Sequence, residues 1–157
     1  MWNRRGIEKL LAEHVQFAKQ HQEEFSIGLI NIDNFKLINE KYPYGTEDAV
    51  LREVGNRILS ACRDSDFVGR WSDEEFLVII NGSHPAELVN VAERLRKNVC
   101  DRMIVYQDVL IPASVTVGLD IFYPANSISA EHIINKLNTA LHTEKTCGEN
   151  KVVCNFE

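Results

Sequence analysis

A short acidic segment between two apolar runs contains the first side chains that could carry out chemistry. Ser72-Asp73-Glu74-Glu75 separates residues 66–71 from residues 76–80, and both flanking runs are typical of strands. We therefore expect a β-hairpin with carboxylates at its tip. Such tips usually contain Gly or Asn, which tolerate positive φ, and this tip contains neither. Carboxylate oxygens are ligands that hard cations such as Mg²⁺ prefer.

An arginine and an aspartate lie three residues apart just before this hairpin, in Arg63-Asp64-Ser65-Asp66. The planar guanidinium can pair with guanine edges or phosphates and can stack on a purine, and the carboxylate can accept guanine N–H groups. The alternative is a solvated ion pair at a helix end, which contributes little to stability. The two residues alone leave both interpretations open.

Composition indicates one globular domain over residues 1–157. The chain is 45% hydrophobic and 25% charged, which is typical of soluble proteins. Its net charge of -6 argues against a nucleic-acid partner. The cysteines form no CxxC pair, the histidines have no metal-ligand spacing, and no apolar run is long enough to contact a membrane as a spanning segment.

Hydrophobic periodicity predicts helices interleaved with strands, which is an α+β arrangement on a mixed, largely antiparallel sheet. The expected helices cover about residues 4–22, 35–41, 84–100 and 129–144, with a further one that Thr46 caps and whose apolar stripe ends at Leu59. The expected strands cover residues 25–32, 66–71, 76–80, 114–122 and 151–156, with a small hairpin at 103–111.

Six further segments join the acidic turn in a consistent order, and together they resemble the GGDEF domain of the diguanylate cyclase family over nearly the whole chain. They are residues 3–5, 31–39, 44–51, 92–96, 116–118 and 145–150. The resemblance implies the nucleotidyl-cyclase palm-like fold, a central mostly antiparallel sheet flanked by helices. Because the chain opens almost at once into a helix, we expect a domain excised from the C-terminal part of a longer protein.

In that family two domains each hold one GTP and join them into cyclic di-GMP, with Mg²⁺ neutralising the phosphate charge. The resemblance assigns Glu74 and the Asn31 position to the metal, with Glu75 beside Glu74, and it assigns Asn39 and Asp48 to the guanine edge. The full set that it implies for the GTP pocket is Asn31, Ile32, Lys36, Asn39, Asp48, Glu74, Glu75 and Lys145.

Several residues depart from the family pattern, and they weaken this pocket. Asn31 replaces a metal-binding aspartate with a neutral amide, Ser72 and Asp73 replace two glycines, and Glu149 stands where a phosphate-contacting arginine is expected. We therefore expect a vestigial pocket that has no confident catalytic or metal-binding residue, requires no cofactor, and uses Mg²⁺ only with residual GTP binding. Outside any pocket, Asn39 would be a cap and Asp48 a partner of a helix dipole.

The resemblance also gives the Arg63–Asp66 pair a role, because five residues separate Asp66 from the turn as in the family's inhibitory site. Arg94 matches a further arginine of that site, which binds cyclic di-GMP in active relatives. The resulting prediction is a catalytically degenerate GGDEF domain that acts as a cyclic di-GMP receptor or regulatory module through Arg63, Asp66 and Arg94. The alternatives are a weakly active diguanylate cyclase and an interaction scaffold that has lost both sites.

The resemblance further implies partners and a location. We expect cyclic di-GMP as the ligand and a homodimer or a protein partner as the assembly, with no nucleic acid. The expected location is the cytoplasm, where such a domain can belong to an inner-membrane protein.

Overall fold

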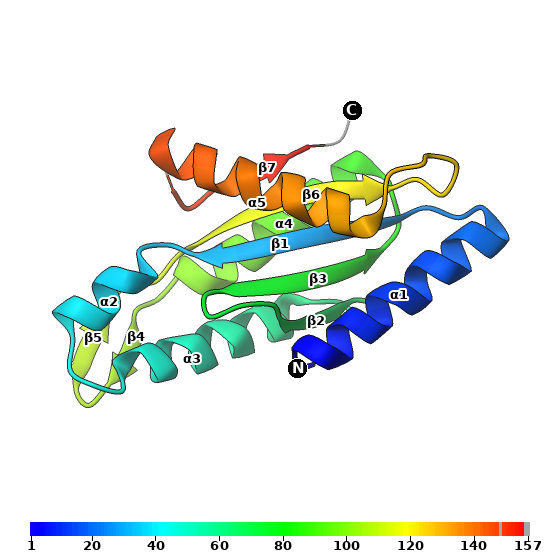
Figure 1. Ribbon diagram of the computed structural model, residues 1–157. Coiled ribbons are helices and arrows are strands. Elements are labelled where there is room, and N and C mark those ends of the chain that lie inside the picture. Colours follow the sequence, from blue (N-terminus) through cyan, green and yellow to red (C-terminus); the bar gives the residue numbers. More distant parts are fainter. Residues whose placement is uncertain (148, 156–157) are drawn as a thin grey trace.

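The computed structural model describes residues 1–147 and 149–155, and the side chains of residues 1–143 and 149–155. Twelve elements follow one another along the chain (Figure 1). They are α1 (Arg4–His21), β1 (Phe25–Ile32), α2 (Phe35–Lys41), α3 (Thr46–Ala61), β2 (Phe67–Arg70), β3 (Glu75–Asn81), α4 (Pro85–Cys100), β4 (Ile104–Tyr106), β5 (Val109–Ile111), β6 (Val115–Phe122), α5 (Ala130–Cys147) and β7 (Val152–Cys154).

The central sheet has the strand order β2-β3-β1-β6-β7. Strand β1 lies in the middle and pairs antiparallel with both β3 and β6, whereas β6 and β7 are parallel. Every residue of β1 is buried, as its continuous apolar run predicts for a central strand. The predicted α+β arrangement on a mixed, largely antiparallel sheet is therefore confirmed.

Helices cover both faces of this sheet, with α5 in front and α4 behind in the view of Figure 1. Side chains alternate along β1, so that Ile27 and Leu29 pack in the cluster that includes residues of α1 and α5. Ile30 and Ile32 pack in the other cluster, which includes residues of α3 and α4. Strand β1 is thus packed against apolar side chains on both of its faces.

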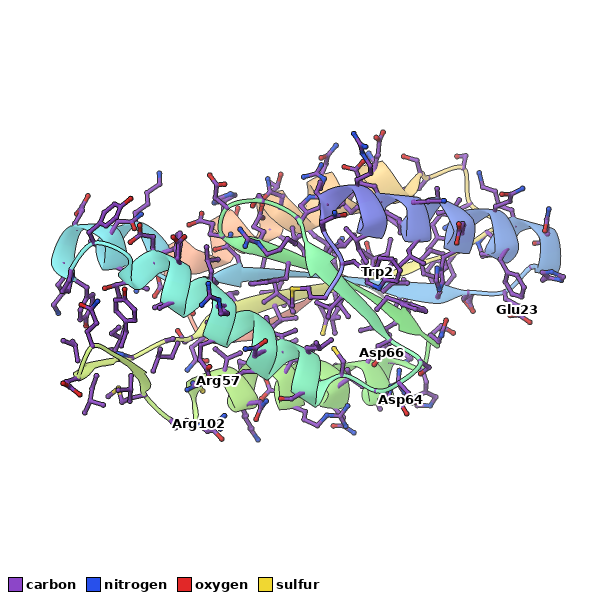
Figure 2. All side chains as sticks on the ribbon, turned by 90° about the horizontal axis from the view of Figure 1, so that it is seen from below. Trp2, Glu23, Arg57, Asp64, Asp66 and Arg102 are labelled. Carbon is purple, nitrogen blue, oxygen red and sulfur yellow. The ribbon has the colours of Figure 1, made fainter. Side chains whose placement is uncertain are left out.

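A buried arginine connects α3 to the end of α4 and the segment that follows it. Arg57 of α3 reaches toward the segment after α4 (Figure 2) and donates to the backbone oxygens of Val99 at 2.7 Å, Arg102 at 2.7 Å and Met103 at 3.1 Å. Its side chain is 4% exposed. The last carbonyls of a helix lack partners within that helix, so Arg57 satisfies groups that would otherwise be buried without donors.

Several predicted boundaries are wrong by a few residues. Thr46 does not cap α3, because Gly45 with φ of 92° takes the cap position and the Thr46 hydroxyl instead donates to the Pro43 oxygen at 2.6 Å. Strand β2 is shorter than the predicted 66–71, β3 already includes Glu75, α5 continues beyond residue 144, and β7 is shorter than the predicted 151–156. Residues 156 and 157 lie outside the described part of the chain.

The acidic hairpin closes without any positive φ at its tip, since no residue from 70 to 76 has one. The Trp71 amide donates to the Glu75 oxygen at 2.9 Å, and the Ser72 hydroxyl donates to Glu75 Oε1 at 2.7 Å. The turn therefore needs neither Gly nor Asn. A second unpredicted feature lies beside it, where Trp2 pairs in parallel with Gly69 on the outer side of β2.

Candidate functional site

The residues predicted for a metal-binding end of the first pocket meet at the ends of β1 and β3. Asn31 is the register partner of Glu75, and the Ile32 amide donates to the Glu74 oxygen at 2.9 Å. Asn31 and Ile32 are buried, and the two glutamates are partly buried. The order of strands in the sheet brings these four residues together from segments about forty residues apart.

Their donor set fits a divalent cation poorly. Asn31 offers an amide where a carboxylate would supply charge, and Glu75 Oε1 already accepts the Ser72 hydroxyl. No cluster of three His, Cys, Asp or Glu side chains that could hold a metal occurs among the residues that the structure describes. One feature favours a cation: Glu75 Oε2 is buried and has no hydrogen-bond partner among these residues.

The neighbouring carboxylate of Asp33 has a structural role. Asp33 is 4% exposed and accepts hydrogen bonds from the Ser114 hydroxyl at 2.6 Å, the Thr116 hydroxyl at 2.7 Å and the Asn150 amide at 3.0 Å. These bonds connect the loop after β1 to the start of β6 and to the segment before β7. Asp33 is therefore a structural anchor, and the sequence analysis did not single it out.

Glu149, which stands at the position of an expected phosphate contact, reaches the start of α2. Its Oε2 accepts a hydrogen bond from the Asn34 side-chain nitrogen at 2.7 Å, and Asn34 has a left-handed φ of 55°. The carboxylate therefore brings negative charge to the loop after β1. Lys145 lies in the last turn of α5, and its side chain is outside the described residues.

The guanine end of the same pocket is more open. Asp48 is exposed in the first turn of α3 and lines a cavity of about 460 Å³ together with Trp2, Arg70 and Phe76. Asn39 is exposed on α2 and does not belong to this lining. The dipole interpretation of Asp48 fits its place in the helix, whereas Asn39 lies inside α2 and caps neither end.

The predicted second site contains a preformed arginine fork. Arg63 Nε donates to Asp66 Oδ2 and Arg63 Nη2 donates to Asp66 Oδ1, both at 3.1 Å. The Arg63 backbone amide donates to Asp66 Oδ2 at 3.1 Å as well, and the Asp66 side chain is fully buried. The hydrogen bond to Asp66 is the main cause that raises the pKa of Arg63, so this guanidinium stays charged at any practical pH.

Two more groups contact Arg63 that the sequence analysis missed. Glu87, in the first turn of α4, accepts from Arg63 Nη1 at 2.5 Å, and the Asn81 backbone oxygen accepts from Arg63 Nη2 at 3.1 Å. An acidic residue in a first helical turn is ordinarily a partner of the helix dipole. The sequence therefore gave no signal that Glu87 belongs to this cluster.

Arg94 approaches the same cluster from the middle of α4. The residue is exposed, and its Nε donates to the backbone oxygen of Ala61, the last residue of α3, at 2.9 Å. Next to Ala61, burial raises the pKa of the Cys62 thiol to about 11, with Asp66 adding to the rise and the charges of Arg94 and Arg63 opposing it. Arg94 is thus bound two residues before Arg63, at the end of α3.

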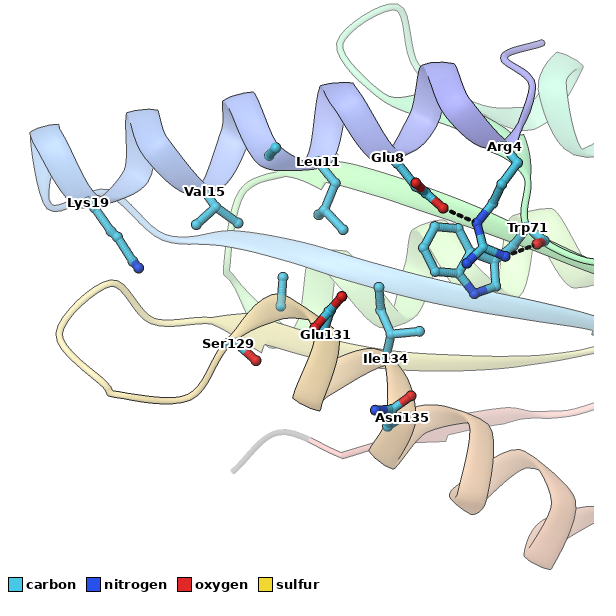
Figure 3. A pocket seen from close by; sticks show the side chains of 12 residues that line it. Arg4, Glu8, Leu11, Val15, Lys19, Trp71, Ser129, Glu131, Ile134 and Asn135 are labelled. Atoms are coloured by element: carbon cyan, nitrogen blue, oxygen red, sulfur yellow. Dashed lines mark hydrogen bonds and ion pairs between the residues drawn. The ribbon is translucent and has the colours of Figure 1, made fainter.

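A larger groove of about 730 Å³ lies between α1 and α5, and Trp71, which precedes the acidic turn, lines one part of it. Figure 3 shows Arg4 at one end of it, stacked over the Trp71 ring at 3.6 Å and bound to Glu8 and to the Trp71 oxygen. Leu11, Val15 and Ile134 line its apolar part. Trp71 therefore acts as a packing aromatic.

None of the helices in the described residues combines the length and the apolar character that crossing a bilayer requires.

Comparison with known proteins identifies related domains. The family model "Diguanylate cyclase, GGDEF domain" matches residues 1–151. Diguanylate cyclase A of Treponema denticola is 35% identical over 146 residues, a match that covers 91% of this chain and 39% of that protein. The chain thus spans about two fifths of that relative's length.

Solved structures show the same fold. The structure of diguanylate cyclase SiaD in complex with its activator SiaC from Pseudomonas aeruginosa matches with a TM-score of 0.89 at 25% identity, covering 97% of this chain and 58% of that one. The GGDEF domain of DgcB from Caulobacter crescentus in complex with c-di-GMP matches with a TM-score of 0.88 at 23% identity, covering 97% and 90%.

Proposed function

Because this chain belongs to the GGDEF diguanylate cyclase family, we propose that it is a catalytically degenerate member that binds cyclic di-GMP through Arg63, Asp66 and Arg94. In this role it is a receptor or regulatory module. It makes little or no cyclic di-GMP itself, and it passes ligand occupancy on through a homodimer or a protein partner.

The carrying observation is the bidentate Arg63–Asp66 pair, with Arg94 bound nearby to the backbone oxygen of Ala61. The bidentate pair with Asp66 fixes the plane of the Arg63 guanidinium, so little rotamer freedom is lost when a guanine or a phosphate binds to it. Arg94 adds a second cation at the end of α3, where its Nε donates to the Ala61 oxygen at 2.9 Å. A planar fork beside a second arginine suits a ligand that combines purine rings with phosphodiester charges.

The state of the first pocket supports the loss of synthesis. Asn31 lowers the charge available to Mg²⁺, and Asp73 and Glu149 add anions near a GTP triphosphate. Relatives give context for the ligand and the partner. The DgcB domain was solved with c-di-GMP and SiaD with an activator protein, so a ligand and a protein partner are both reasonable for this chain.

Isothermal titration calorimetry with cyclic di-GMP tests the proposal. We expect saturable binding by the wild-type domain that is lost in Arg63→Ala and Asp66→Ala and strongly weakened in Arg94→Ala. Arg63→Lys keeps the charge but removes the fork, so it should also weaken binding. Arg96→Ala is the matched control, because Arg96 of α4 also pairs with one glutamate, Glu93, but belongs to neither site. Absence of binding by the folded wild-type protein would refute the proposal.

A weakly active diguanylate cyclase is the second candidate, and one observation favours it. The buried Oε2 of Glu75, beside Asn31, has no hydrogen-bond partner within the described part of the chain, so a cation could bind it without breaking a hydrogen bond to these residues. A forced dimer incubated with Mg²⁺ and GTP distinguishes the two candidates. Steady formation of cyclic di-GMP by that dimer would favour the cyclase, and its absence would favour the receptor.

A further inference from the structure

The two arginines of the proposed cyclic di-GMP site are not equally available to a ligand. Arg94 uses its Nε for the Ala61 oxygen, is exposed, and forms no ion pair with any residue that the structure describes. Arg63 instead has all three of its nitrogens engaged. Its inner edge is bound to Asp66, and its Nη1 is bound to Glu87 at 2.5 Å.

The contact with Glu87 differs in kind from the contact with Asp66. The Asp66 side chain is fully buried and also accepts the Arg63 backbone amide, so it belongs to the fold. The Glu87 side chain is 60% exposed and comes from a different element, the first turn of α4. An exposed carboxylate of this type is held weakly and can rotate into solvent.

The negative charge of Glu87 also opposes binding of an anionic ligand. Cyclic di-GMP carries one negative charge on each of its two phosphodiesters, and Glu87 adds another beside the same guanidinium. A phosphate or guanine that pairs with Arg63 must therefore displace the carboxylate or lie next to it, and like charges in that position repel each other.

We propose that Glu87 is a built-in competitor for Arg63, which lowers the affinity of the site for cyclic di-GMP by occupying the outward nitrogen of the fork. This inference rests on the proposed function. In the free domain Glu87 pairs with Arg63, and in the bound domain it turns away while the ligand takes its place. Glu87 is thus an affinity-setting residue that contacts the ligand's binding partner and not the ligand.

Calorimetry of wild type and Glu87→Gln with cyclic di-GMP tests this inference. The substitution keeps the length of the side chain and removes its charge. The ligand then no longer competes with an exposed ion pair and no longer meets a repulsive charge, so we expect its affinity to rise about 3- to 10-fold. Glu8→Gln is the matched control. Glu8 is 50% exposed and pairs with Arg4 on α1, which packs in the other helical layer, so its loss should change affinity less than twofold.

The outcomes separate the inference from the function on which it rests. If wild type binds and Glu87→Gln binds equally well or more weakly, Glu87 is neutral or a ligand contact, and the inference is wrong while the proposed function stands. If none of the folded proteins binds at the highest ligand concentration, the proposed function fails. An equal rise in Glu8→Gln would show a general charge effect and would also overturn the role of Glu87.

Discussion

Replacing Arg63 with alanine should destabilise the domain as well as abolish ligand binding, because this side chain joins three elements. It holds the buried Asp66 beyond the end of α3, the Asn81 oxygen at the end of β3 and Glu87 at the start of α4. Breaking a fully buried ion pair costs about 3–5 kcal/mol, because one charge stays buried without its partner. The Arg63 side chain is 29% exposed, so water compensates in part and we expect a loss of about 2–3 kcal/mol.

Urea unfolding followed by circular dichroism at pH 7 measures this loss directly. Thermal unfolding gives a second measurement. A domain of this size loses about 2–4 °C of Tm per kcal/mol of lost stability, so the Tm of Arg63→Ala should fall by about 4–12 °C. Glu87→Gln, which removes an exposed partner, should change the free energy of unfolding by less than about 0.5 kcal/mol. If Arg63→Ala were as stable as Glu87→Gln, the Arg63–Asp66 pair would not be the structural link inferred here.

Three further changes test other parts of the account. Arg57→Met should lower the free energy of unfolding by about 3–4 kcal/mol, since three backbone oxygens lose a buried donor, and a loss below about 1 kcal/mol in urea unfolding would contradict this. The folded state raises the pKa of Cys62 from 9.0 to about 11, so its contribution to stability is complete below pH 9 and is lost as pH rises to 11. Unfolding measured from pH 8 to 11 should therefore show a steeper fall for wild type than for Cys62→Ser, and parallel curves would refute the shift. Asn31→Asp alone should not yield cyclic di-GMP from GTP, because Asp73 and Glu149 still oppose the triphosphate, and chromatographic detection of appreciable product would show that the metal ligand was the only defect.

The arrangement of strands and helices was predictable because it depends on local periodicity. The apolar run of β1 and the stripes of α1, α3 and α4 are visible in the sequence, and each forms the predicted element. The cap of α3 was not predictable in this way. Thr46 has a good capping side chain, but Gly45 adopts positive φ where an added Cβ would lie 2.8 Å from the Tyr106 hydroxyl. That neighbour is about sixty residues away, so only the folded chain reveals the constraint.

In the candidate sites, too, some contacts could be predicted from the sequence and others could not. The Arg63–Asp66 pair spans three residues, and its ion pair was one of the two interpretations that this spacing left open. The meeting of Asn31 with the acidic turn across the sheet was implied by the family resemblance. Glu87 and Asp33 act through partners that are 24 and more than 80 residues away, respectively. Their roles depend on how the elements pack, and no spacing in the sequence indicates them.

Chemical-shift mapping by ¹H–¹⁵N NMR during titration with cyclic di-GMP tests the central claim most directly, because it locates the ligand. The account predicts saturable shifts concentrated at residues 61–66 and at residues 87–94 of α4, with little change at Asn31, Asp48 and Glu74. Shifts concentrated at those last three residues would place the ligand in the GTP pocket. That result, or the absence of saturable shifts, would contradict the proposal that Arg63, Asp66 and Arg94 form a cyclic di-GMP site.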